Sequence, residues 1–202
     1  MYTSSLAKTM KQLIAKKGLV MIYEGHGKGK TTAVVGLAVR AVGAGLRVFM
    51  VQFIKGEWPN GERDFFNAFN VVRQQYQGEK KLGTIEVVTS GRGFVKILGD
   101  KKPLSEHQAA ARRALELGRR AMRSGNYDLI ILDEAISAIE TKLIKTSDLL
   151  KLVREKPGLV HLVMTGHDAP KSLVAKADLV SEVKMVKHPY YQGVLAQRGI
   201  DY

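Results

Sequence analysis

The stretch Glu24-Gly-His-Gly-Lys-Gly-Lys-Thr-Thr32 (EGHGKGKTT) follows the apolar run LVMIY at residues 19–23 and precedes a helical pattern over residues 30–44. Its glycines allow consecutive backbone N–H groups to point inward around an anion. The helix that follows adds the positive end of its dipole to the same place. Strand, glycine-rich turn and helix in this order therefore predict a phosphate-binding loop.

The spacing within this loop is unusual. The common motif has four residues between its first glycine and its Gly-Lys-Thr, whereas only three residues separate Gly25 from Gly29 here. Two interpretations stay open at this point. The loop is either an ordinary ATPase loop with one irregular position, or a loop that holds a triphosphate for a purpose other than cleaving the γ-phosphate.

The side chains of the loop have separate expected contacts. The Lys30 ammonium is predicted to bind phosphate oxygens, and the Thr31 hydroxyl is predicted to bind Mg²⁺. Thr32 is expected to cap the helix or to contact a further phosphate. The whole predicted triphosphate cradle consists of Gly25, His26, Gly27, Lys28, Gly29, Lys30, Thr31 and Thr32.

A second part of a nucleotide site follows another apolar run. Asp133 and Glu134 come directly after the segment LIIL at residues 129–132. Asp133 is expected to hold Mg²⁺ (or Mn²⁺) through water, and in hydrolytic ATPases the following glutamate positions the attacking water. ATP binding with a divalent metal is therefore predicted. Hydrolysis, phosphoryl transfer and chemistry elsewhere on the nucleotide all start from this cradle, so the reaction stays open.

Strand-like and helix-like patterns alternate along the chain. Apolar runs too continuous for half-exposed strands occur at 19–23, 48–53, 85–88, 129–132, 159–164 and 179–183. Helical patterns lie at 30–44, 104–123, 146–156 and 170–177, and irregular stretches at 54–64, 76–84 and 90–103 are expected to build the site. We expect an α/β fold of the P-loop NTPase (RecA-like) type, with a mostly parallel sheet in a three-layer α/β/α arrangement.

The helix at 104–123 has the clearest pattern, with Ala111, Leu115, Gly118 and Met122 facing the sheet. Its arginines lie off that stripe, which is typical of a solvated face but also compatible with a nucleic-acid track. They are Arg112, Arg113, Arg119, Arg120 and Arg123.

Composition narrows the functional classes. The 202 residues, 45% hydrophobic and 25% charged, suit one globular domain. The absence of cysteine excludes disulfides, thiolate nucleophiles and Cys-ligated metal, and no signal peptide or apolar span is visible, so we expect a cytoplasmic protein without a membrane segment. The net charge of +13 favours acidic partners, yet no basic block with interleaved aromatics occurs, and nucleic acid is not an expected partner.

Several longer motifs are far more specific than the loop. They are RAVGAG at 40–45, VQFIKGEWPNGE at 51–62, ILDE at 131–134, TG at 165–166, DLVSE at 178–182, VKH at 186–188 and GIDY at 199–202. With EGHGKGKTT, this set resembles the CobA/BtuR/CobO-type ATP:corrinoid adenosyltransferases from about residue 18 to the end.

The resemblance implies a reaction and an answer to the spacing problem. Members of this family move the 5′-deoxyadenosyl group of ATP onto the reduced cobalt of a corrinoid such as cobalamin and release triphosphate. A shortened loop is associated there with ATP lying in reverse, so that the loop grips a leaving group. The resemblance makes Lys30, Thr31 and Glu134 the expected catalytic residues, with Thr31, Asp133 and Glu134 at the metal. Glu134 is then no hydrolytic base.

Further site residues follow only from the resemblance. Arg40 is expected near the nucleoside, and His188 near the ribose or the corrinoid. His26 stands where the family often has Asn. Phe94 matches a Gly-Phe-x-Trp motif that removes the lower axial ligand of cobalt, whereas Lys96 replaces its aromatic residue, and Trp58, Ile97 or Leu98 are expected to compensate. The remaining site residues are Gln52, Lys55, Gly56 and Glu62.

The resemblance also implies partners. A flavoprotein is expected to reduce the cobalt. Residues 1–17 are amphipathic, with Leu6, Met10, Leu13 and Ile14 on one stripe. They either pack on their own domain, residues 18–202, or form a lid over the partner in a homodimer. The alternatives to the transferase are a RecA-like, nucleic-acid-dependent ATPase and, third, a small-molecule kinase.

Overall fold

A computed structural model describes residues 17–56, 61–78, 81–93 and 102–201. The predictions for the N-terminal amphipathic segment, Trp58, Phe94 and residues 96–98 lie outside these ranges, apart from Lys17. Lys17 places its ammonium 2.5 Å from Asp178 Oδ1.

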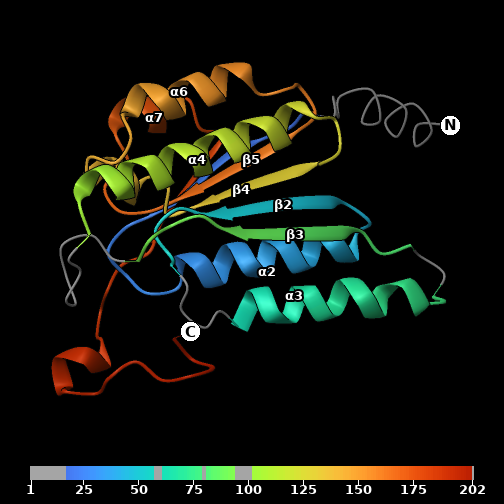
Figure 1. Cartoon of the computed structure of the whole chain (residues 1–202), viewed down its shortest axis with the longest axis horizontal. Helices are drawn as coiled ribbons and strands as arrows, with labels where there is room; N and C mark the ends of the chain where they lie inside the picture. The colour runs from blue at the N-terminus through green and yellow to red at the C-terminus, as the bar shows by residue number, and fades with distance from the viewer. Residues whose placement is uncertain (1–16, 57–60, 79–80, 94–101, 202) are drawn as a thin grey trace, which may run out of the picture.

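The centre of the molecule is a six-stranded sheet in the order β3-β2-β4-β5-β1-β6 (Figure 1). Every strand pair is parallel. The strands are β1 (Val20–Glu24), β2 (Arg47–Gln52), β3 (Thr84–Thr89), β4 (Leu129–Asp133), β5 (His161–Thr165) and β6 (Leu179–Glu182). The near-continuous burial of the inner strands explains their unbroken apolar sequences.

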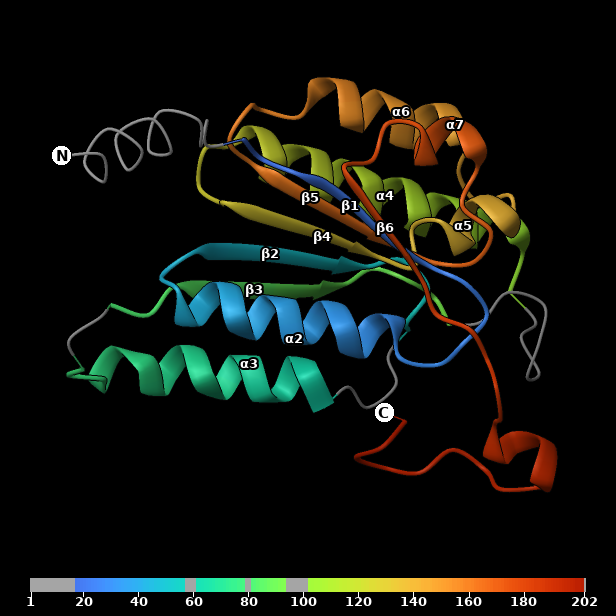
Figure 2. The same ribbon diagram turned by 180° about the vertical axis from the view of Figure 1, so that it is seen from behind.

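Helices cover both faces of this sheet. One face carries α2 (Lys30–Gly43) and α3 (Gly61–Val72), and the other carries α4 (Leu104–Arg123), α5 (Ser137–Glu140), α6 (Thr146–Glu155) and α7 (Lys171–Val174) (Figures 1 and 2). Two short 3₁₀ turns, η1 (Arg73–Gln75) and η2 (Pro189–Gln192), complete the described elements. Each face has its own apolar core, one centred on α2 and one on α4. The predicted three-layer α/β fold is confirmed.

The helix α4 follows its predicted bounds. Ala111, Gly118 and Met122 are buried on the sheet, and Leu115 is half-buried. A Cβ on Gly118 would lie 2.6 Å from Leu132 Cδ2, so the glycine sets how closely α4 approaches β4. Off the stripe, Arg119 donates two hydrogen bonds of 2.7 and 2.8 Å to the Glu155 carboxylate and thereby joins α4 to α6.

The segment 54–64 is not irregular throughout, because α3 begins at Gly61. This part of the prediction was wrong. The helix buries Phe66 against the sheet, and the Asn70 side chain bonds both backbone groups of Ile85 on β3. One buried side chain in twelve residues is a faint periodic signal, which explains why the pattern was missed.

The parallel order brings four strand ends to the same edge of the sheet. β1 ends before the glycine loop, and Gln52, Asp133 and Thr165 are the last residues of β2, β4 and β5. Since ligands of open α/β sheets bind beyond the carboxyl ends of the strands, this edge is the place to look for a site.

None of the helices in the described part of the chain has both the length and the apolar character that a membrane span needs.

Candidate active site

The glycine loop leaves β1 in a conformation that requires glycine. Gly25 and Gly29 have φ angles of 102° and 118°. A Cβ on Gly25 or Gly27 would lie 2.6 Å from the carbonyl oxygen of Val183, and the Gly27 N–H donates to that oxygen at 2.7 Å. The segment after β6 therefore braces the loop from outside and fixes its shape.

The Lys30 ammonium lies in the middle of this loop. It donates to the carbonyl oxygens of Gly25 at 2.6 Å and Gly27 at 2.9 Å. Burial lowers the pKa of Lys30, while the nearby Glu134 and Asp133 carboxylates act in the opposite direction. The loop thus holds a positive charge at its centre, where it can bind the oxygen atoms of a polyphosphate.

The start of α2 corrects one prediction. The residue before the helix is Gly29, and no side chain caps the helix there. Thr32 is exposed. The expected capping role of Thr32 was therefore wrong, because Gly29 occupies the capping position and Thr32 is the third residue of the helix. Its contact with a further phosphate stays a prediction. The first N–H groups of α2 remain available for an anion.

Asp133 is the centre of a buried polar cluster. It is fully buried and accepts hydrogen bonds from Thr31 Oγ1 at 3.1 Å, Thr165 Oγ1 at 2.8 Å and Gln52 Nε2 at 3.3 Å. Burial raises the pKa of Asp133, and these hydrogen bonds lower it. The cluster joins α2 to the ends of β2, β4 and β5.

Glu134 follows in a strained backbone conformation. Its φ of 62° is unusual for a residue with a side chain, and its N–H donates to Thr165 Oγ1 at 2.7 Å. Burial, together with the neighbouring Asp133 charge, raises the pKa of Glu134 to about 7. The carboxyl is therefore held close to its neutral form beside the Lys30 ammonium.

The oxygen atoms at this point suit a hard divalent cation. Thr31 and the two carboxylates are all oxygen donors, and Mg²⁺ is usually held by one or two carboxylates plus waters and substrate phosphates. Across the described ranges, no cluster of three or more His, Asp or Glu side chains suited to a metal ion occurs.

Some of the other expected site residues lie near the Asp133 cluster, whereas Arg40 lies away from the loop. Lys55 Nζ lies 3.2 Å from Glu62 Oε1, and the Lys55 charge lowers the pKa of both Asp133 and Glu134, so this pair faces the site. Gly56 packs beside Gly93 with no room for a Cβ. Arg40 is exposed ten residues further along α2 than Lys30, about 15 Å along the helix axis. Within one chain it is not brought to the loop.

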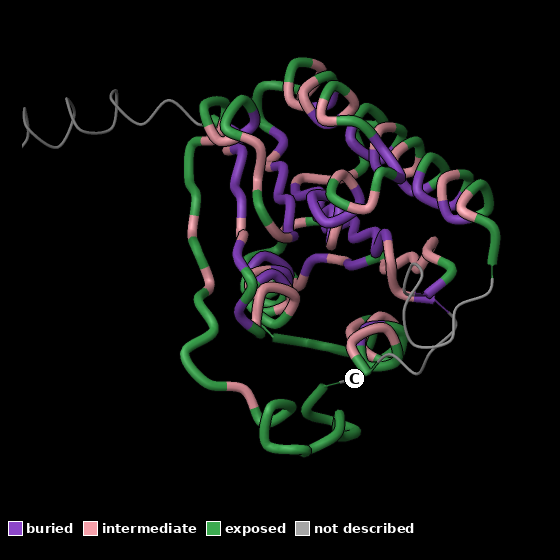
Figure 3. The backbone as a smooth tube through the Cα atoms, turned by 90° about the vertical axis from the view of Figure 1, so that its left-hand side faces the viewer, coloured by how far each residue is buried: buried purple, intermediate pink, exposed green. Residues whose placement is uncertain are grey.

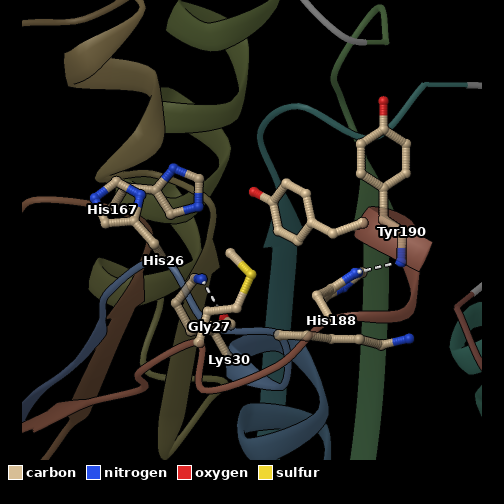
Figure 4. A pocket seen from close by; sticks show the side chains of 9 residues that line it. His26, Gly27, Lys30, His167, His188 and Tyr190 are labelled. Atoms are coloured by element: carbon tan, nitrogen blue, oxygen red, sulfur yellow. Dashed lines mark hydrogen bonds between the residues drawn. The ribbon is translucent and has the colours of Figure 1, made fainter. Parts of the chain in front are cut away.

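A pocket of about 260 Å³ opens beside the loop (Figure 4). One wall comes from the loop and the turn after β5, and the other from the segment around η2. His188 is on the second wall, where its Nδ1 accepts from the Tyr190 N–H at 3.2 Å. The lining residues are His26, Gly27, Lys28, Lys30, His167, Met185, His188, Tyr190 and Tyr191.

The C-terminal segment returns to the loop after a long exposed course (Figures 1 and 3). Lys28 Nζ donates to the Ile200 carbonyl oxygen at 3.2 Å and pairs with the Asp201 carboxylate. The GIDY motif, which drew attention only as a specific stretch of sequence, thus contacts the phosphate loop directly.

Sequence reasoning did not place Thr165, His167 or Asp201 in the site. Thr165 had one usable signal, a polar residue that ends a buried strand before a glycine. Asp201 lies in the specific GIDY motif, but nothing in the sequence placed that motif beside the loop, and His167 had no signal. Both positions depend on strand order and on the path of the last segment.

Comparison with known proteins gives a consistent result. The family model for ATP:corrinoid adenosyltransferase BtuR/CobO/CobP matches residues 16–202. A corrinoid adenosyltransferase of Escherichia coli (strain K12) is 33% identical over 93% of this chain and 87% of its own. The corrinoid adenosyltransferase CobA of Salmonella typhimurium gives the same three values, and one from a Sinorhizobium species is 32% identical over 96% and 85%. The chain belongs to the BtuR/CobO/CobP family of ATP:corrinoid adenosyltransferases.

Proposed function

We propose that the protein transfers the 5′-deoxyadenosyl group of ATP to the one-valent cobalt of a corrinoid and releases triphosphate. The observation that carries the proposal is the convergence of Lys30, Thr31 and Asp133 on a shortened glycine loop in a chain of this family. These groups serve a polyphosphate, and the adjoining pocket leaves room for the rest of the substrate beside it.

In this reaction carbon is attacked and phosphorus is not. The cobalt supplies an electron pair to C5′ of the ribose, the C5′–O bond breaks, and the triphosphate leaves with the bonding pair. Negative charge therefore grows on the phosphate chain. The Lys30 ammonium and the N–H groups at the start of α2 are aimed at that charge and stabilise it as it forms.

Thr31, Asp133 and Glu134 would hold a Mg²⁺ (or Mn²⁺) ion that arrives with ATP. When bound, the ion supplies further positive charge to the leaving triphosphate. No water needs to be activated, so Glu134 requires no role as a base. Its raised pKa fits a carboxyl that takes up full negative charge once a cation is beside it.

The other assignments remain part of the proposal. Lys55 and Glu62 lie toward the metal side of the site, with Gln52 bonded to Asp133, and His188 faces the pocket from the η2 wall. Arg40 would have to meet the nucleoside of another subunit, which agrees with a proposed homodimer. We also propose that a flavoprotein reduces the cobalt and that the protein is cytoplasmic. In this proposal the transferase domain comprises residues 18–202, the segment 1–17 precedes it, and Phe94 lies near the corrinoid.

The test is product analysis. Incubation with ATP, Mg²⁺ and chemically reduced cobalamin should yield a light-sensitive adenosylated corrinoid together with intact triphosphate. Orthophosphate released in step with turnover would show that the loop cuts phosphate and would reject the proposal. A rise in orthophosphate release on addition of DNA would instead favour a nucleic-acid-dependent ATPase, and ADP as the product would indicate a kinase.

A further inference from the structure

Two histidines from separate elements meet beside the phosphate loop. His26 is part of the loop, and His167 lies in the turn after β5. Their rings stack with centroids 4.9 Å apart at an interplanar angle of 26°. Both line the same pocket as Lys30 (Figure 4). The reaction described above includes His26 in the triphosphate cradle but gives the His167 imidazole no role.

The turn that carries His167 is built to one shape. Gly166 has a φ of 152°, and a Cβ there would lie 2.3 Å from the Ser137 nitrogen, so only glycine fits. Glu24, the residue just before the shortened loop, contributes its carboxylate to this turn. Three backbone N–H groups of the turn donate hydrogen bonds. The Gly166 N–H donates to the Tyr23 carbonyl oxygen at 3.2 Å, and the His167 N–H donates to Ser137 Oγ at 3.2 Å. The Ala169 N–H donates to Glu24 Oε2 at 2.7 Å.

Each ring has one nitrogen beside a carboxylate. Glu140 Oε2 lies 3.4 Å from His167 Nδ1, and Asp168 Oδ1 lies 3.2 Å from His26 Nε2. A neutral imidazole has a single N–H, which these carboxylates draw to their own side. The other nitrogen then has only a lone pair. Because phosphate oxygens are acceptors, either ring can donate to phosphate only when it carries a second proton.

Burial and the neighbouring cations disfavour that second proton on His167 in the absence of an anion. Burial lowers the pKa of His167, the Lys30 ammonium on α2 lowers it further, and His26 acts in the same direction. Glu140 on α5 raises it, and Asp168 adds a carboxylate next to His26. A polyphosphate at the loop would reverse this balance, since it brings several negative charges beside the ring.

We propose that His167, stacked on His26, binds the triphosphate as an imidazolium, so that polyphosphate binds together with a proton taken from solvent and leaves as that proton is lost. This inference rests on the proposed function only in that the loop holds a triphosphate. It makes His167 a substrate-binding residue from outside the loop, and it makes product release dependent on pH.

The experiment is calorimetry of inorganic tripolyphosphate with the full chain, at about pH 6.5 and about pH 8.5, each in two buffers of different ionisation enthalpy. Tripolyphosphate takes up protons itself, so the wild type is compared with His167→Gln under identical conditions. At the lower pH we expect the variant to bind tripolyphosphate about tenfold more weakly, because it loses one charge-assisted hydrogen bond. It should also take up fewer protons on binding. At the higher pH the difference in affinity should shrink.

Two further variants separate charge from structure. His167→Arg has a permanent positive charge and should bind tripolyphosphate well at both pH values, without the extra proton uptake of the wild type. Lys151→Gln removes one charge from the exposed face of α6, on the opposite layer to α2, and should behave as wild type.

Equal proton uptake in the wild type and His167→Gln overturns the inference, and so does an equal loss of affinity at both pH values. If the wild type fails to bind tripolyphosphate, the proposed role of the loop fails as well. Proton uptake that depends on His167 in a protein without transferase activity would instead support the inference and reject the proposed function.

Discussion

At the scale of single residues, Glu134 combines several costs that an ordinary structural residue would not carry. It has a left-handed backbone, a half-buried side chain and a neighbouring buried acid in Asp133. Strain and like charge at one position persist only where the surrounding structure enforces them, as Thr165 does by binding the Glu134 N–H. Such a combination is compatible with the proposed contact of Glu134 with a metal ion.

This carboxyl should make stability depend on pH. Its pKa is about 7 in the folded protein against 4.5 when unperturbed, so the folded state binds more protons between these values. The stabilising contribution is therefore complete below about pH 4.5 and is lost as pH rises through about 7. With EDTA at about pH 8, Glu134→Gln should raise the free energy of unfolding by roughly 2 kcal/mol, because it removes a charge that partial burial and the neighbouring Asp133 disfavour.

Urea unfolding of the wild type and the variant at about pH 8 and about pH 5 checks this expectation. Near pH 5 the wild-type carboxyl is protonated and the two proteins should differ little. A gain of the same size at both pH values would mean that the amide packs better, and that charge is not the cause.

At the scale of elements, α2 and α4 each contain an interior glycine in a different environment. Gly118 on α4 faces Leu132 and Val51 in a full core, whereas Gly36 on α2 is exposed with open space around it. Gly118→Val should lower the free energy of unfolding by about 1–3 kcal/mol, because a closely packed core must shift to admit the side chain. Chemical denaturation measures the loss.

Gly36→Val is the matched control, since it changes the same residue type in a helix without touching the core. Its stability should stay within about 0.5 kcal/mol of the wild type or rise slightly, because valine is a better helix former than glycine. Equal losses in both variants would indicate a helix-propensity effect and would refute the packing role of Gly118.

The C-terminal segment competes with the substrate for a cation of the loop. Asp201 pairs with Lys28, and its carboxylate stands where a polyphosphate brings like charge. Asp201→Asn should therefore tighten tripolyphosphate binding roughly two- to fivefold, the range expected for a partly exposed ion pair. Asp64→Asn on α3, which removes an exposed carboxylate elsewhere, should leave the affinity unchanged. Weaker binding in Asp201→Asn would mean that the segment holds the polyphosphate.

The elements also show what sequence can and cannot predict here. The cradle from Gly25 to Thr32 is contiguous, and Asp133 ends an unmistakable apolar run, so local chemistry was enough to find both. Thr165 and His167 enter the site because β5 lies between β1 and β4, and no local pattern encodes that order. The contact between Lys28 and Asp201 spans 173 residues and depends on the path of the whole last segment.

At the scale of the whole molecule, the phosphate loop and the Asp133 cluster lie at one edge of the sheet. The chain has a net charge of +13, yet Arg119, Arg120 and Lys55 are paired with carboxylates. In the loop at that edge, Lys28 is paired with Asp201 and Lys30 donates to two backbone carbonyl oxygens. Binding of MgATP should therefore stabilise the entire fold, because α2, β4 and β5 all meet at the Asp133 cluster.

The expected size of this stabilisation by MgATP follows from mass action. At a free MgATP concentration about 100 times the dissociation constant, the folded state gains about 2.7 kcal/mol. For a chain of 202 residues this corresponds to a rise in Tm of roughly 5–10 °C. EDTA should reduce the rise, because Thr31 and Asp133 then lose the cation that links them to the phosphates. Lys30→Ala should nearly abolish it, while Lys151→Ala on α6 should retain it in full. A rise in Lys30→Ala equal to that of the wild type, measured by thermal unfolding at the same MgATP concentration, would show that the nucleotide binds away from the glycine loop and would remove the basis for a loop that holds the leaving triphosphate.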